Sequence, residues 1–157
     1  MPKKTQILSV RIERVVDENP DLSHLGEYSD TPGPNAIDRR ERGDAGAREY
    51  RYCNITMSAA ETGNPESVEQ DYQRMQAYNR FEWWMIGIIA KAKVKLANSD
   101  VIQTIHSGGL WGIESDAGDD YFAEVEANEL AQLKDELKAV GCTDRQIDHA
   151  FSKVTKP

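Results

Sequence analysis

The sequence is poor in the features that mark several protein classes. It has only two cysteines, Cys53 and Cys142, too few and too far apart for a disulfide framework or a zinc site. The longest apolar stretch, Met85–Ala90, is far shorter than a membrane span. The opening residues, MPKKTQILSV, lack the apolar run of a signal peptide. We therefore expect a cytoplasmic protein with free thiols and no membrane association.

Positive charge is scarce in the last third of the chain. Residues 99–157 hold 5 Lys/Arg and 12 Asp/Glu, so this third carries −7 of the net charge of −8. A protein that binds duplex DNA normally shows a basic face, so direct duplex binding is not expected. An acidic face suits a basic protein partner, divalent cations or plain solubility.

The segment Ser107–Glu129, SGGLWGIESDAGDDYFAEVEANE, concentrates this charge directly after a glycine-rich stretch around Trp111. The glycines allow two interpretations. They kink the chain so that Trp111 and the acids face a ligand, or they accommodate a bulge with Trp111 in the core, which we favour. The segment contains seven acids: Glu114, Asp116, Asp119, Asp120, Glu124, Glu126 and Glu129.

Hydrophobic periodicity predicts an α+β fold. Alternation predicts strands over 5–17, 48–57, 81–96 and 101–110. Helical spacing predicts a helix capped by Asn64, a second from Asp116 or Asp119 to about Val140, and a short last one after a capping box at Thr143–Gln146. The prediction is one domain over 1–157, an antiparallel three- to four-stranded sheet with helices on one face and two helices at the C-terminus.

Residues 18–46 are rich in Pro, Gly, Asp and Ser. This composition predicts a long solvated loop, with an arm that orders on a partner as the alternative. The strand over 81–96 has one apolar face, and a second face that changes from apolar residues to Lys91, Lys93 and Lys95. The tryptophans Trp83 and Trp84 point to opposite faces of this strand, and we expect both to be buried.

Catalytic patterns are weak. Asp116, Asp119 and Asp120 offer oxygen ligands for Mg²⁺ or Ca²⁺, but their spacing is not that of a calcium loop, and we favour helix-end electrostatics as the explanation. Glu126 and Glu129 lie beyond the first turn, where we expect a solvated face. His106 and Ser107 are adjacent on a strand and point apart, so a hydrolase site is not expected.

The motifs DLSHLGEYSD, EQDYQRMQAYNR and above all SGGLWGIESD resemble a family of uncharacterised small proteins of phages and bacterial mobile elements. The family has no established activity, so the resemblance transfers no catalytic residue. It implies an accessory protein in a bacterial host cell. Such proteins often bind host machinery, and small acidic ones can mimic the charge of DNA to block defence or DNA-processing proteins.

Three hypotheses follow. The first is a non-enzymatic protein without cofactors that binds a basic host protein through Trp111, Glu114, Asp116, Asp119, Asp120 and Glu124. The second is a metal-dependent enzyme that uses the carboxylates between Glu114 and Asp120. The third is a structural or homodimerising module whose acids only keep it soluble.

Overall fold

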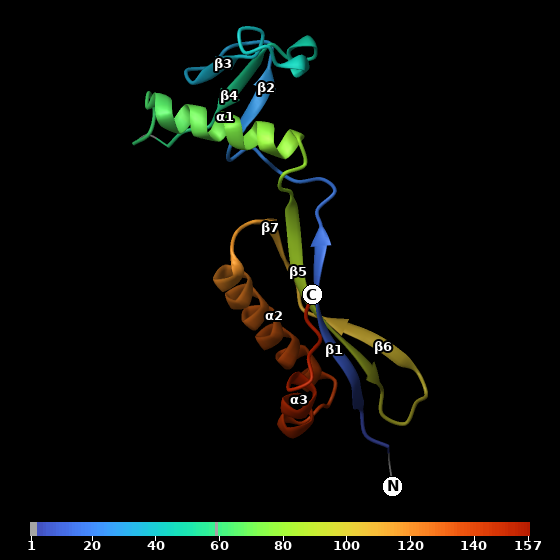
Figure 1. Ribbon diagram of the computed structural model, residues 1–157. Coiled ribbons are helices and arrows are strands. Elements are labelled where there is room, and N and C mark those ends of the chain that lie inside the picture. The colour runs from blue at the N-terminus through green and yellow to red at the C-terminus, as the bar shows by residue number, and fades with distance from the viewer. Residues whose placement is uncertain (1–2, 59) are drawn as a thin grey trace. The chain divides into compact units, whose positions relative to one another are not determined.

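A computed structural model describes residues 3–58 and 60–157 (Figure 1). Its contacts divide the chain into two compact units, whereas the sequence predicted one domain. Met1–Glu18 and Met85–Pro157 form the terminal unit, and Asn19–Trp84 form the inserted unit. The elements are β1 (Gln6–Val16), β2 (Gly26–Ser29), β3 (Ala36–Asp38), η1 (Ala45–Arg48), β4 (Tyr52–Ile55), α1 (Pro65–Asn79), β5 (Met85–Lys95), β6 (Ile102–His106), β7 (Leu110–Glu114), α2 (Asp119–Ala139) and α3 (Asp144–Phe151).

The sheet of the terminal unit is built around β5. Strand β1 pairs antiparallel with β5 along almost its whole length, from Gln6 opposite Lys95 to Val16 opposite Ile86. The other edge of β5 pairs with β6 over Lys91–Lys95 and with β7 over Met85–Ile88. The single strand expected over 101–110 is therefore two strands, because the chain leaves the ladder at Ser107–Gly109, where Gly109 has a φ of 79°.

One face of this sheet forms the core with α2 and α3. Ile86, Ile88, Ala90, Ala92 and Val94 of β5 are all buried, as strand alternation predicted. Contacts join α2 to β5 and β6, and α3 to β1. Each large apolar side chain buried here contributes about 1.5–3 kcal/mol relative to exposure. The helices supply Phe122, Val125, Leu133, Leu137 and Ile147 to this core.

The ends of the C-terminal helices are set mainly by residues that are close to them in sequence. The N-cap of α2 is Gly118, with a φ of 101° and no side-chain cap, so neither Asp116 nor Asp119 caps it as predicted. Asp119 and Asp120 are its first helical residues, where negative charge suits the helix dipole. Gly141, with a φ of 94°, follows the helix, and the capping box between Thr143 and Gln146 is confirmed.

The inserted unit corrects the prediction of a long loop over 18–46. Strands β2 and β3 lie within that range and flank β4 in a three-stranded antiparallel sheet, on which α1 packs. Strands of three or four residues are too short for alternation to reveal. The helix predicted from Asn64 is confirmed, and the Asn64 side chain accepts hydrogen bonds from the backbone of Glu66 and Ser67.

A buried ion pair stabilises the segment that was predicted to be a loop. Arg39 is only 5% exposed, and its Nε donates to Asp44 Oδ2 at 2.7 Å. Burial alone would raise the pKa of Asp44, but hydrogen bonds from Arg39, Gly46 and Gln76 bring this pKa below its ordinary value. A Cβ at Gly46 would lie 1.8 Å from Arg39 Nη2, so glycine leaves room for the guanidinium.

Both units are α+β. Within the described residues, their antiparallel sheets have three and four strands, and two of the three α-helices lie near the C-terminus, as predicted. Among the described residues, the helices are all too short or too polar to cross a membrane.

Candidate functional site

Burial divides the acidic segment into two groups. Asp116, Asp119, Asp120 and Glu124 are exposed, and Glu114 is half-buried. Glu126 and Glu129 are 5% and 3% exposed, so the prediction that they belong to a solvated face was wrong. Both lie on the same side of α2 as Phe122 and Val125, which face the sheet.

The two buried glutamates have structural partners. Glu129 Oε2 accepts a hydrogen bond from the backbone N–H of Gly109 at 2.9 Å, at the corner between β6 and β7. Glu126 forms ion pairs with Arg14 at 3.3 Å and with Lys156 at 3.5 Å. These carboxylates therefore fix β7, β1 and the C-terminal residues against α2, and they are satisfied within the unit.

The exposed acids at the start of α2 have no such partners. Within the described part of the chain, the side chains of Asp119, Asp120 and Glu124 take part in no ion pair or hydrogen bond. Asp120 and Glu124 are four residues apart, so they are neighbours on the helix surface and repel each other by a few tenths of a kcal/mol. We call Asp119, Asp120 and Glu124 the acidic surface.

An aromatic residue that the sequence prediction missed lies beside these carboxylates. Tyr121 is 42% exposed and, three residues before Glu124, neighbours it on the helix surface. It lies four residues before Val125, at the edge of the apolar stripe, so the helical wheel gave no clear sign of its exposure. Tyrosine is enriched in protein interfaces because its ring is apolar and its hydroxyl is polar.

The other predicted site residues lie elsewhere or are already engaged. Glu114 ends β7, and both Glu114 and Asp116 have interaction partners within the structure. Trp111 is 50% exposed, which corrects the favoured reading of a core residue. It lies over Gly87, on the sheet face opposite that of Ile86 and Ile88, whereas α2 packs on the Ile86 face. The structure therefore separates Trp111 from the acidic surface.

The metal-site hypothesis finds no assembled ligand set. Among residues 3–58 and 60–157, no three His, Cys, Asp or Glu side chains come close enough to hold a metal ion. The predicted ligands, Asp116, Asp119 and Asp120, are exposed around a turn and a helix start, and they do not converge on one point.

Ser107 has a structural role. It is 1% exposed, its backbone N–H donates to Ala90 O at 2.9 Å, and its Oγ accepts from the Ala90 N–H at 3.0 Å. His106 is exposed and lies on the other side of the strand, with Nδ1 2.6 Å from the Ser107 carbonyl oxygen. The side chains of His106 and Ser107 therefore point to opposite sides of the strand, as alternation predicted.

The other tryptophans differ from each other. Trp83 is 1% exposed and packs edge-on against Tyr78, with the Arg74 guanidinium over its ring, so its predicted burial is confirmed. Trp84 is 45% exposed, so the expectation that it is buried was wrong. It precedes β5 and lies outside the alternating part of the strand.

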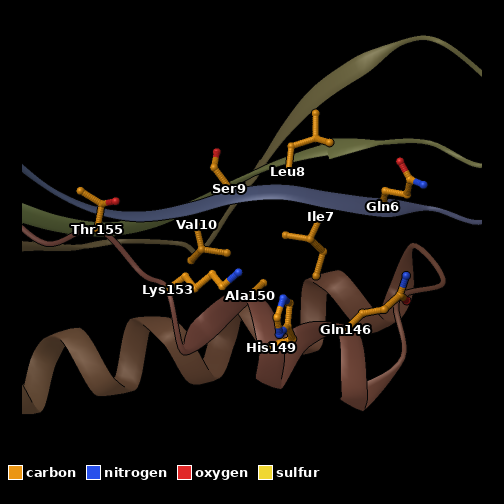
Figure 2. A pocket seen from close by; sticks show the side chains of 10 residues that line it. All are labelled: Gln6, Ile7, Leu8, Ser9, Val10, Gln146, His149, Ala150, Lys153 and Thr155. Atoms are coloured by element: carbon orange, nitrogen blue, oxygen red, sulfur yellow. The ribbon is translucent and has the colours of Figure 1, made fainter.

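Two of the cavities, one in each unit, are lined by residues outside the acidic surface. One of about 460 Å³ opens between β1 and α3, and Figure 2 shows Ile7 and Val10 pointing toward α3 while Leu8 points away. The other, of about 350 Å³, lies beside Asp44 and Gln76 in the inserted unit. There Gln76 Nε2 donates to Asp44 Oδ2 at 2.8 Å, so these polar groups satisfy each other.

Comparison of the chain with models of protein families, with curated proteins and with solved structures gives no match.

Proposed function

We propose that the protein is a non-enzymatic accessory protein that binds a basic protein through the acidic surface on α2. One observation carries this proposal: Asp119, Asp120 and Glu124 are exposed and have no ionic partner in the described chain, while Glu126 and Glu129 of the same helix are buried and satisfied. The dipole of α2 accounts for Asp119 and Asp120 in the first turn but not for Glu124 in the second.

The binding energy has two sources in this proposal. The carboxylates raise the association rate with a basic surface and make it sensitive to salt. Tyr121, beside them, supplies the aromatic contact that is desolvated when the partner binds, the role that the sequence predicted for Trp111. Resemblance to proteins of phages and mobile elements suggests that a partner be sought in a bacterial host, among nucleic-acid-processing or defence proteins.

A pull-down from bacterial host lysate tests the proposal. The bait is the full chain, and the acid variant carries Asp119→Asn, Asp120→Asn and Glu124→Gln. Washes at about 50 and 200 mM salt span a range in which contacts between exposed charges weaken strongly. EDTA in both buffers removes bridging by divalent ions. We expect one basic protein that the wild type retains at low salt, loses at high salt, and that the acid variant does not retain.

A matched control carries the same change of charge elsewhere, through Glu27→Gln, Asp135→Asn and Glu136→Gln at exposed positions. It should retain the partner as the wild type does. If the control variant loses the partner as the acid variant does, net charge alone explains the binding. If the acid variant retains the partner, the acidic surface is not the binding site.

A further inference from the structure

The terminal sheet has a second face on which, among the described residues of that unit, no helix packs. The alternate residues of β5 point to it, from Gly87 and Ile89 to Lys91, Lys93 and Lys95. Their neighbours across the ladder are Arg11 and Ser9 on β1, and Thr104 and His106 on β6. We call this surface the open face. It is distinct from the acidic surface, which lies on the helical side of the sheet.

The open face is cationic in a chain of net charge −8. Lys91, Lys93 and Lys95 follow one another at alternate positions, and Arg11 is opposite Lys91. Glu13 lies between Arg11 at 2.6 Å and Lys91 at 2.7 Å, so one carboxylate is shared by two cations. Lys95 pairs with the largely exposed Asp100 at 3.0 Å.

After this pairing, positive charge remains in excess. Lys93 is exposed and, within the described chain, has no ionic partner. The pair of cations around Glu13 adds a second unbalanced charge. Hydrogen bonds from Lys91 and Arg11 lower the pKa of Glu13, so its carboxylate stays ionised and holds both side chains on the face.

At the other end of the face lies an aromatic platform. A Cβ on Gly87 would lie 2.4–2.8 Å from three carbon atoms of the six-membered ring of Trp111, so one face of the indole covers the glycine. Trp111 is 50% exposed, so its outer side is open to solvent. Ile89 lies between this ring and the lysines. The track from Gly87 to Lys95 is about 27 Å long at the usual strand rise.

We propose that the open face binds single-stranded nucleic acid, with phosphates along Lys91, Lys93 and Lys95 and a base stacked on Trp111. Cations that follow the backbone and an aromatic ring that receives a base are the two elements of strand binding without sequence preference. A pleated sheet holds both at fixed positions, because its side chains stand on a rigid ladder.

The same features disfavour two other occupants. Bases in a duplex are stacked on one another and cannot reach Trp111, and the described part of the open face has no helix that could enter a groove. An acidic peptide would match the lysines but would leave the aromatic platform without a ring to stack on it. Single-stranded nucleic acid uses the whole track.

Fluorescence anisotropy of the full chain tests this proposal, with a labelled oligothymidylate of about 15 nucleotides, near the upper site size of compact single-strand binders. Affinity should fall with salt at a log–log slope of about −2, since each single-strand phosphate contact contributes about −0.7. Changing Lys91, Lys93 and Lys95 to Gln should weaken binding at least about tenfold and bring the slope close to zero.

The matched control changes Lys134, Lys138 and Lys153 to Gln, three lysines of the helical side, and should bind as the wild type does. Trp111→Leu keeps an apolar cover on Gly87 and should cost about tenfold in affinity without changing the slope, while Trp111→Phe should recover part of the loss. Thermal melting of each variant verifies folding.

Several results would overturn the proposal. These are no binding by the wild type, equal affinity for the corresponding duplex, full competition by oligoglutamate at equal charge, and equal weakening by the two lysine triples. Failure of the pull-down on the acidic surface would leave this experiment unaffected, because the two use different sides of the sheet.

Discussion

At the scale of single residues, the contact between Gly87 and Trp111 holds an aromatic ring on the surface of the sheet. One side of the ring packs against the strand, and this contact is possible because position 87 has no Cβ. The glycine is buried while the ring is half-exposed, so the ring substitutes for the missing side chain.

Gly87→Ala should therefore destabilise the terminal unit by about 1–3 kcal/mol, because the added methyl group displaces the ring or the strand. Urea unfolding measures the loss. Gly108→Ala is the control, since a Cβ there would lie 3.5 Å from the end of the Gln132 side chain and at a φ that other residues adopt. Equal stabilities of the two variants would contradict the described packing.

A second residue-scale feature is the exposed pair between Arg42 and Glu69 in the inserted unit. Two hydrogen bonds from Arg42, with a third from Gln73, lower the pKa of Glu69 from 4.5 to about 2. A carboxyl group whose pKa is lowered by folding stabilises the folded state. This stabilisation is fully present above the pKa of the unfolded state and is lost as the pH falls through the pKa of the folded state.

The unfolding free energy of the inserted unit should thus fall between pH 4.5 and about pH 2, and Glu69→Gln should make this fall shallower. Urea unfolding over this pH range, followed by the fluorescence of the buried Trp83, measures it. Glu27→Gln, at an exposed position of β2, should keep the slope of the wild type. Identical slopes for wild type and Glu69→Gln would refute the assignment.

At the scale of elements, α2 organises the terminal unit through its apolar residues and two buried acids. Glu129 accepts a hydrogen bond from the corner between β6 and β7, and Glu126 forms an ion pair with Arg14 of β1. The start of the same helix carries the exposed carboxylates. One helix therefore carries structural acids where it packs on the sheet and surface acids near its start.

Glu129→Ala should destabilise the unit by about 1–3 kcal/mol, because the Gly109 N–H loses its acceptor in a partly buried place. Hydrogen exchange at Gly109 should accelerate together with the global loss in urea. Glu124→Ala, which removes an exposed acid of the same helix, should change stability by no more than about 0.5 kcal/mol. Unchanged exchange at Gly109 would show that the bond is not formed.

Elements with local signals could be predicted from the sequence. The cap at Asn64 and the capping box at Thr143–Gln146 fix helix starts through contacts within a few residues, and both are confirmed. The break between β6 and β7 could not be predicted, because it depends on β5 pairing with both strands along one edge. Glu126 and Glu129 escaped prediction for a related reason, since their partners are distant in sequence.

At the scale of the whole molecule, the inserted unit leaves the terminal unit between two paired strands. Val16 near the end of β1 is opposite Ile86 near the start of β5, so the chain departs and returns at neighbouring positions. The sequence predicted the helix after Asn64 and a strand over 48–57 in this unit, but only a loop over 18–46, because strands of three or four residues and a buried Arg39–Asp44 pair leave no periodic signal. Of the candidate site, it identified the acids on α2 but not Tyr121 or the separation from Trp111.

The charge of the terminal unit is likewise distributed by the sheet. The acidic surface lies on the helical side, and Arg11 and the three lysines of β5 lie on the open face. We therefore expect these two surfaces to bind ligands of opposite charge independently of each other. The two ligands to use are the basic protein that the pull-down is expected to capture and labelled oligothymidylate.

The most direct measurement titrates each of these two ligands against the wild type, the acid variant and the variant with Lys91, Lys93 and Lys95 changed to Gln, in one buffer of about 50 mM salt. The account predicts that the acid variant loses the basic protein and keeps the oligonucleotide, and that the lysine variant shows the reverse. Parallel loss of both ligands in either variant, or retention of both, would contradict it.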